Sequence, residues 1–163
     1  MKIRILYIFL VISQINSAQN SLKELLATYN DETIPYISVQ KLKSIQTKVV
    51  LLDAREKKEF DVSHIKNAIY VGYDHFDIND ITNLNLSKES TIVVYCSLGV
   101  RSEDISKKLK KVGYHKIYNL YGGIFEWKNN DNQIINNKGE TTEEVHIYSK
   151  QWEKWLHKGK KVH

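Results

Sequence analysis

The segment with the clearest chemical potential surrounds the single cysteine of this 163-residue sequence, Cys96. The cysteine follows an apolar run and precedes a segment with helical spacing, so we expect it in a short loop between a strand and a helix. In open parallel sheets, such loops at the carboxyl ends of strands bind ligands. The loop contains Gly99 and can curl so that successive backbone N–H groups attract an anion, and Arg101 adds a positive charge. We expect these groups to favour the thiolate form of Cys96.

A thiolate in this position is a nucleophile that can hold a transferred sulfur atom as a persulfide, whose negative terminal sulfur the same donors would hold. The alternative is a buried, unreactive cysteine. Ser102 is placed to cap the following helix, and its hydroxyl can also face the loop. We interpret Cys96 as the catalytic residue. The predicted substrate-binding residues are the six that follow it: Ser97, Leu98, Gly99, Val100, Arg101 and Ser102.

Strands and helices alternate around this loop, which predicts a parallel sheet covered by helices on both faces. Continuous apolar runs predict buried strands over 48–54 and 91–95. Further strands are expected over 36–37, 68–71 and 116–120. The strongest helical spacing covers 102–112, and Gly113 follows at the position of a C-terminal cap. Shorter helices are expected over 21–29, 38–45, 56–62 and 123–129, with a loop or weak helix over 76–83.

The composition changes after residue 130 and ends in a segment rich in aromatic residues. Over 149–158, helical spacing would place Trp152, Trp155 and Leu156 on one face, with Tyr148 nearby. We expect this helix to pack its aromatic side chains on the domain. The alternative is a stripe that binds a partner.

The first eighteen residues have the pattern of a secretory signal peptide. Lys2 and Arg4 precede an apolar run over 5–12, and the small or polar residues at 16–18 offer a cleavage site. The apolar run is short for a membrane span, so we expect no stable membrane anchor. An uncleaved anchor or a buried first strand is the alternative. The pattern predicts a periplasmic or secreted protein.

Composition and charge narrow the possible functions. Hydrophobic residues make up 42% and charged residues 26%, as in ordinary globular domains. Without Lys2 and Arg4 the formal charge falls from +5 to +3, which is too small to indicate a nucleic-acid partner. A lone cysteine cannot form an internal disulfide, so in an exported protein we interpret it as reactive. Five histidines show no metal-ligand spacing: His75, His115, His146, His157 and His163.

Three groups of residues, in this order along the chain, resemble motifs of the rhodanese family of sulfurtransferases. The central group resembles the active-site loop and consists of Cys96, Gly99, Arg101 and Ser102. The preceding group is Asp53-Ala54-Arg55, Glu59-Phe60, His64-Ile65 and Ala68. The following group is Gly113-Tyr114, Leu120, Gly122-Gly123-Ile124 and Trp127. The resemblance covers about 36–130 and gives four parts: signal peptide 1–18, helical lead-in 19–35, rhodanese domain 36–130 and C-terminal extension 131–163.

The resemblance implies an α/β rhodanese-like fold around a five-stranded parallel sheet, with helices on both faces. It also implies a double displacement, in which a sulfane donor such as thiosulfate gives its outer sulfur to Cys96 and an acceptor then removes it. Cyanide or a thiol, the latter free or on a protein, is the implied acceptor, and neither a metal nor an organic cofactor is implied. We interpret Asp53, Arg55 and His64 as supporting residues: the first two anchor the loop after the strand, and the third is hydrogen-bonded scaffold. The alternatives are a direct chemical role for Asp53 and Arg55 and a role as a base for His64.

Two other functions compete with this interpretation. Related phosphatases and arsenate reductases have one more residue between Cys and Arg than the four found here, which makes room for a tetrahedral oxyanion. The second competitor is a sulfur carrier or thiol relay without turnover. Some efficient thiosulfate-using members of the family carry a basic residue directly after the cysteine, where this sequence has Ser97, so the donor is left open.

Overall fold

The structure is a computed structural model that describes residues 22–163, and the predicted signal peptide over 1–18 lies outside them. Residues 22–32 and 33–163 belong to two separate units. In the first unit, residues 22–29 are helical, within the helix expected over 21–29. Among the described residues, no helix is both long enough and apolar enough to cross a bilayer.

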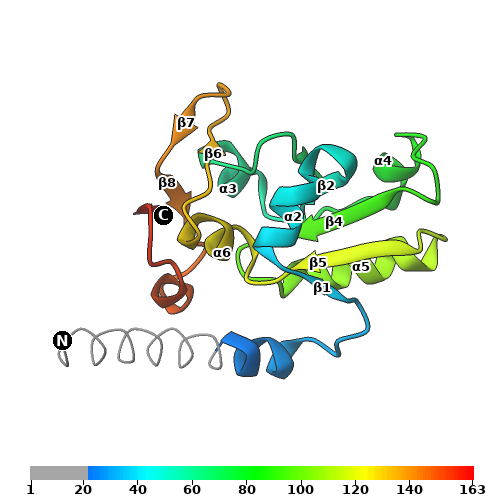
Figure 1. Ribbon diagram of the computed structural model, residues 1–163, viewed down its shortest axis with the longest axis horizontal. Coiled ribbons are helices and arrows are strands. Elements are labelled where there is room, and N and C mark those ends of the chain that lie inside the picture. Colours follow the sequence, from blue (N-terminus) through cyan, green and yellow to red (C-terminus); the bar gives the residue numbers. More distant parts are fainter. Residues whose placement is uncertain (1–21) are drawn as a thin grey trace, which may run out of the picture. The chain divides into compact units, whose positions relative to one another are not determined.

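An entirely parallel, five-stranded sheet forms the centre of the second unit (Figure 1). Its strand order is β1 (Tyr36–Ile37), β5 (Lys116–Leu120), β4 (Thr91–Tyr95), β2 (Val50–Asp53) and β3 (Ile69–Tyr70). The central strand β4 pairs with β2 on one side and β5 on the other. Its apolar run, like that of β2, reflects burial on both faces. The sheet confirms the predicted fold class.

Helices cover both faces of the sheet. They are α2 (Val39–Ile45), α3 (Lys57–Val62), α4 (Ile78–Thr82), α5 (Arg101–Lys111) and α6 (Gly123–Asn129), with the 3-10 helix η1 (Gln46–Lys48) after α2. On one face, Ile105 and Leu109 of α5 and Ile81 of α4 form a core with Leu52 and Ile92. The neighbouring strand residues Leu51 and Val93 are also buried and point to the other face, because side chains alternate along a strand.

The C-terminal segment forms two small two-stranded sheets that the sequence does not predict (Figure 1). They pair β6 (Ile134–Ile135) with β7 (Thr141–Thr142), and β8 (Glu144–His146) with β9 (Lys160–Val162). Between β8 and β9 lies η2 (Lys150–Trp155), a 3-10 helix in place of the longer helix expected over 149–158. It is short because the chain becomes extended at Leu156, and Gly159, with a φ of +96°, precedes β9.

Side-chain hydrogen bonds attach this C-terminal segment to the domain. Asn129 of α6 donates from Nδ2 to the backbone oxygen of Trp155 over 2.9 Å, and its Oδ1 accepts from the backbone N–H of His157 over 2.8 Å. Trp155 and Leu156 are buried, and β8 lies against α3. The aromatic segment therefore folds back on the domain, as the sequence predicts.

Candidate active site

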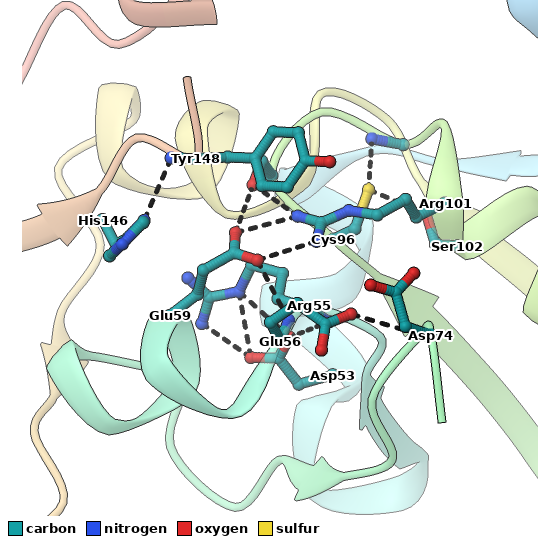
Figure 2. Close-up of polar contacts among 12 residues, drawn as sticks. Asp53, Arg55, Glu56, Glu59, Asp74, Cys96, Arg101, Ser102, His146 and Tyr148 are labelled. Atoms are coloured by element: carbon teal, nitrogen blue, oxygen red, sulfur yellow. Dashed lines mark hydrogen bonds and ion pairs between the residues drawn. The ribbon is translucent and has the colours of Figure 1, made fainter. Parts of the chain in front are cut away.

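Cys96 lies directly after β4, in the loop that leads into α5 (Figure 2). Its Sγ accepts a hydrogen bond from the Gly99 backbone N–H over 3.1 Å, and the Ser102 hydroxyl lies 3.5 Å away. Gly99 has a φ of +116°, a conformation that glycine adopts without steric cost, so the loop can curl back over the sulfur. The side chain is buried, with only 2% of its surface exposed. The arrangement can stabilise negative charge on a sulfur atom.

The start of α6 supports the other side of this loop. The backbone N–H groups of Ile124 and Phe125 donate to the carbonyls of Cys96 and Ser97 over 2.9 and 3.2 Å. This close approach requires glycine at position 123, because a Cβ there would lie 2.3 Å from the Cys96 oxygen and 2.6 Å from the Ser97 oxygen. The loop is therefore fixed by backbone contacts on both sides of Cys96.

Arg101 points from α5 to Glu59 of α3 and not to the sulfur (Figure 2). Its two terminal nitrogens donate to the two carboxylate oxygens over 2.7 and 2.8 Å, and Nη2 also donates to Ser97 Oγ over 3.1 Å. The Ser97 hydroxyl in turn donates to Glu59 over 3.1 Å. Within the described residues, no hydrogen bond joins Arg101 to Cys96. Arg101 thus braces the loop directly, whereas its charge reaches the sulfur only through space.

The charges of this pair are held in place by burial and mutual attraction. Burial raises the pKa of Glu59, but hydrogen bonding and the charge of Arg101 outweigh it, so that the pKa lies below its usual value. For Arg101, burial lowers the pKa, and hydrogen bonds to Glu59 followed by the charges of Cys96 and Glu59 raise it to a net value above the ordinary one. Both groups therefore stay ionised at neutral pH. The sequence interpretation included Glu59 only in a family motif, because nothing in its local spacing distinguishes it from Glu56.

Ser102 does not cap α5, so that prediction is wrong. The helix begins at Arg101 and its N-cap is Val100, whose carbonyl accepts from the Glu103 backbone N–H over 3.1 Å. The Ser102 hydroxyl instead faces the loop, the other position that the sequence allows. It lies 2.7 Å from Asn119 Oδ1 as well as 3.5 Å from Sγ, and its single hydrogen can serve one of these acceptors at a time.

Asn119 of β5 completes the polar network and was missed from the sequence. It is fully buried, and its Nδ2 donates to the Gly99 carbonyl over 2.8 Å and to Glu103 over 3.2 Å. A signal was present in the strand: Asn119 is two residues after Ile117 and therefore shares its buried face. A polar residue at such a position needs buried partners, and the cysteine loop supplies them.

The predicted supporting residues lie in the scaffold beneath the loop. Arg55 is fully buried and donates to both carboxylate oxygens of Asp53, including Nη2 to Oδ2 over 2.7 Å, and to the Ser63 carbonyl over 2.6 Å. His64 Nδ1 lies 3.0 Å from the Phe60 carbonyl, and the His64 backbone pairs with Ile135. These contacts anchor the end of β2 and the segment after α3, and none of them reaches Cys96.

A cavity of about 240 Å³ opens onto Cys96. Four of the predicted substrate-binding residues line it, whereas Gly99 and Ser102 lie behind the sulfur. Three aromatic residues from other segments, which were not predicted for the site, complete the wall. The lining residues are Tyr73, Cys96, Ser97, Leu98, Val100, Arg101, Tyr148 and Trp152. Within residues 22–163, no cluster of three or more His, Cys, Asp or Glu side chains is arranged to hold a metal ion.

The family model described as the rhodanese-like domain matches residues 38–130. This chain belongs to the rhodanese-like domain family. The match includes the loop from Cys96 to Ser102 and both elements that support it, α5 and α6. The C-terminal extension of this rhodanese-like chain, with Tyr148 and Trp152, lies beyond the match.

Individual relatives agree with this family. The chain is 40% identical over 97 residues to the tRNA uridine(34) hydroxylase of Aster yellows witches'-broom phytoplasma, covering 56% of this chain and 32% of the relative. It is 33% identical over 91 residues to the adenylyltransferase and sulfurtransferase UBA4 of Meyerozyma guilliermondii, covering 53% and 22%. The chain thus spans a third or less of the length of these relatives.

The fold also resembles solved structures. The thiosulfate sulfurtransferase of Pseudomonas aeruginosa superposes with a TM-score of 0.60 at 19% identity, covering 76% of this chain and 23% of that one. At this identity the similarity concerns the fold alone. It agrees with the parallel sheet and its helices.

Proposed function

We propose that the chain is a sulfurtransferase that carries a sulfane sulfur on Cys96. The observation that supports this most directly is the position of Sγ, 3.1 Å from the Gly99 N–H at the base of a cavity. A persulfide formed there places its terminal sulfur in the cavity while the inner sulfur keeps its backbone donor. Membership of the rhodanese-like family and the sulfurtransferase named among the relatives support the same reaction class.

In the first step, the Cys96 thiolate attacks the outer sulfur of the donor. A new S–S bond forms on Cys96. The bond between the outer sulfur and the rest of the donor breaks, and its electron pair departs with the leaving group, which would be sulfite when the donor is thiosulfate. In the second step, cyanide or a thiolate attacks the terminal sulfur, which gives thiocyanate or a new persulfide and restores the Cys96 thiolate. Gly99 and Ser102 would stabilise charge on the inner sulfur in both steps. The pair of Arg101 and Glu59 would hold the loop in position.

We prefer sulfur transfer to hydroxylation of tRNA, although several relatives, the phytoplasma protein among them, are named for the latter. The chain spans 32% of that protein, so the activity of the whole relative does not carry over to a third of its length. The groups that converge here are a thiol and the hydrogen-bond donors that favour an anionic sulfur.

The test is to incubate the full chain with thiosulfate and measure the intact mass, with Cys96→Ser as the control. We expect one added sulfur atom on the wild-type chain and none on the variant. Cyanide should then release thiocyanate over many cycles, whereas a carrier or relay without turnover would release a single equivalent. Hydrolysis of an aryl phosphate without sulfur uptake would contradict the proposal and favour a phosphatase.

We further propose that the protein acts outside the cytoplasm, on the basis of Lys2, Arg4 and the apolar run over 5–12. Expression of the full chain in a Gram-negative host should yield a periplasmic protein that lacks about eighteen N-terminal residues, as N-terminal sequencing would detect. An intact N-terminus in the cytosolic fraction would contradict export and leave the proposed chemistry untouched.

A further inference from the structure

The cavity above Cys96 has walls from two sources. The loop residues Leu98 and Val100 belong to the matched domain, whereas Tyr148 and Trp152 belong to the C-terminal extension. Tyr148 is held in place at two points. Its backbone N–H donates to His146 Nδ1 over 3.0 Å, and its ring lies over the Arg101 guanidinium at 4.3 Å (Figure 2). The extension therefore contributes fixed aromatic surface to the candidate active site.

The charges around this cavity are unfavourable for a small dianion. Arg101 is the only cationic residue among those that line it, and both oxygens of Glu59 bind its guanidinium. On the rim, the Tyr73 hydroxyl donates to Asp104 over 2.8 Å, and this hydrogen bond, with burial and the Asp104 charge, raises the pKa of Tyr73 to about 12. Neither carboxylate lines the cavity, but each binds a residue that does, so thiosulfate would meet a single cation whose charge Glu59 already balances.

The cavity is better suited to an apolar group. Three aromatic rings and two aliphatic side chains face it: Tyr73, Tyr148, Trp152, Leu98 and Val100. Its volume of about 240 Å³ is below the range for drug-sized ligands, which begins at about 300 Å³. This is space for a single ring or a short branched chain beside a sulfane sulfur.

We propose that Tyr148 and Trp152 of the extension make the site selective for sulfane donors that carry an apolar organic group. The inference deepens the proposed sulfur transfer and rests on it. With an organic thiosulfonate, the Cys96 thiolate attacks the outer sulfur and forms the persulfide. The bond between that sulfur and the sulfonyl sulfur breaks, and its electron pair leaves with the sulfinate. The apolar group of the donor packs between the rings, where burial of its surface favours binding.

The test compares three donors with cyanide as the common acceptor: benzenethiosulfonate, methanethiosulfonate and thiosulfate. The two thiosulfonates carry the same charge and differ in the group on the sulfonyl sulfur. The change of their kcat/KM ratio between wild type and variants isolates the contribution of the cavity walls, because intrinsic reactivity cancels. We expect the wild-type chain to prefer benzenethiosulfonate to methanethiosulfonate by at least about tenfold, the preference expected for one buried ring. Thiosulfate, with its second negative charge, should be the poorest donor.

Variants locate the preference in the extension. Trp152→Ala and Tyr148→Ala should each reduce this ratio by about fivefold to tenfold, whereas Tyr148→Phe should retain it because the ring is kept. Tyr36→Ala is the matched control. Tyr36 contacts the ring of Tyr121, lies on β1 and does not line the cavity, so the ratio should stay unchanged. Circular dichroism of each variant verifies that it folds. If Trp152→Ala does not fold, Trp152→Leu takes its place, because it also removes the ring.

Two results would overturn the inference: equal kcat/KM values for the two thiosulfonates in the wild-type chain, or an equal loss with all three donors in the alanine variants. Either result would leave sulfur transfer standing, because Cys96 would still gain sulfur. Failure of every donor to add sulfur to Cys96 would instead reject the proposed function and this inference together.

Discussion

The cysteine loop and the C-terminal extension meet at the same cavity but are built differently. The loop is held by buried backbone and side-chain hydrogen bonds, so Gly99, Ser102 and Asn119 lie behind Cys96 with almost no exposed surface. The extension presents aromatic side chains, and Tyr148 is 49% exposed. The position of the sulfur is therefore fixed by the domain, whereas the chemical character of the cavity depends also on Tyr148 and Trp152, which lie outside the domain. Perturbations of the loop should therefore have large effects, and those of the extension smaller ones.

The largest effect is expected at the sulfur itself. Cys96→Ser should abolish sulfur uptake, because Cys96 is the only thiol in the sequence. Its free energy of unfolding should change by no more than about 1 kcal/mol, since the hydroxyl keeps a partner in the Gly99 N–H. Intact mass after incubation with a donor and a urea denaturation curve measure the two quantities. Sulfur bound to the serine variant would place the acceptor group elsewhere.

Gly123→Ala, which adds a single methyl group, should strongly lower the free energy of unfolding. A Cβ at this position would clash with two backbone carbonyls of the loop, and the residue has a φ of +54°. The start of α6 would shift, breaking two hydrogen bonds in addition to the left-handed strain, so we expect a loss of about 4 kcal/mol in unfolding free energy.

Gly139→Ala is the matched control for this change. Gly139 has a φ of +79° but no atom within 4 Å of a Cβ. The substitution should therefore lower the free energy of unfolding only by the backbone strain, about 1 kcal/mol. Urea denaturation of both variants gives the comparison. Equal losses would mean that the approach of α6 to the loop is not tight.

Glu59→Gln removes the partner of a buried guanidinium. We expect a loss of about 3 kcal/mol at neutral pH, because Arg101 would keep its charge without compensation. A double-mutant cycle with Arg101→Met should show strong coupling between the two positions.

The pH dependence of stability provides a second measurement on Glu59. Its folded pKa is below the ordinary value of 4.5, so its contribution is fully present above that pH and is lost as the pH falls through the lower folded value. The free energy of unfolding, measured by urea denaturation, should thus fall more steeply from pH 6 to pH 3 for the wild type than for Glu59→Gln. Parallel curves would contradict a net stabilisation of the carboxylate.

The smallest effect is expected at His146 in the extension. Burial lowers its pKa below 6.5, and its Nδ1 accepts the backbone hydrogen bond of Tyr148 only when it carries no proton. The unfolded chain therefore binds a proton first, and stability is lost as the pH falls from 6.5 through the folded value. We expect a difference of about 1 kcal/mol or less between wild type and His146→Gln across this interval. If the free energy of unfolding of the wild type rose on acidification relative to that of His146→Gln, the result would contradict the lowered pKa of His146.

The sequence predicts the sheet well because its strands carry strong signals. Leu51 and Leu52, like Val93 and Val94, belong to short continuous apolar runs, which are typical of strands buried on both faces. The loop position of Cys96 follows from the same pattern, since the strand ends just before it. Local sequence therefore predicts that the thiol lies in a loop at the carboxyl end of a strand.

The contacts that the sequence does not reveal join residues far apart in the chain. Glu59 and Arg101 are 42 positions apart, and no local spacing relates them. Tyr148 and Trp152 reach the cavity through strands of two or three residues, which are too short to show periodicity. The spacing of Trp152, Trp155 and Leu156 predicts a helix over 149–158, but pairing of β9 with β8 limits it to a 3-10 helix.

Under the proposed function, the presence of one buried thiol would also determine how a stored sulfur is lost. A persulfide next to a second cysteine decays internally, because the neighbouring thiol displaces hydrosulfide and closes a disulfide. These 163 residues contain no second cysteine, and the one that they have is 2% exposed. Under the proposed function, the lifetime of the stored sulfur would then depend on how readily outside nucleophiles enter the cavity, and the aromatic walls would set the rate of leakage as well as the choice of donor.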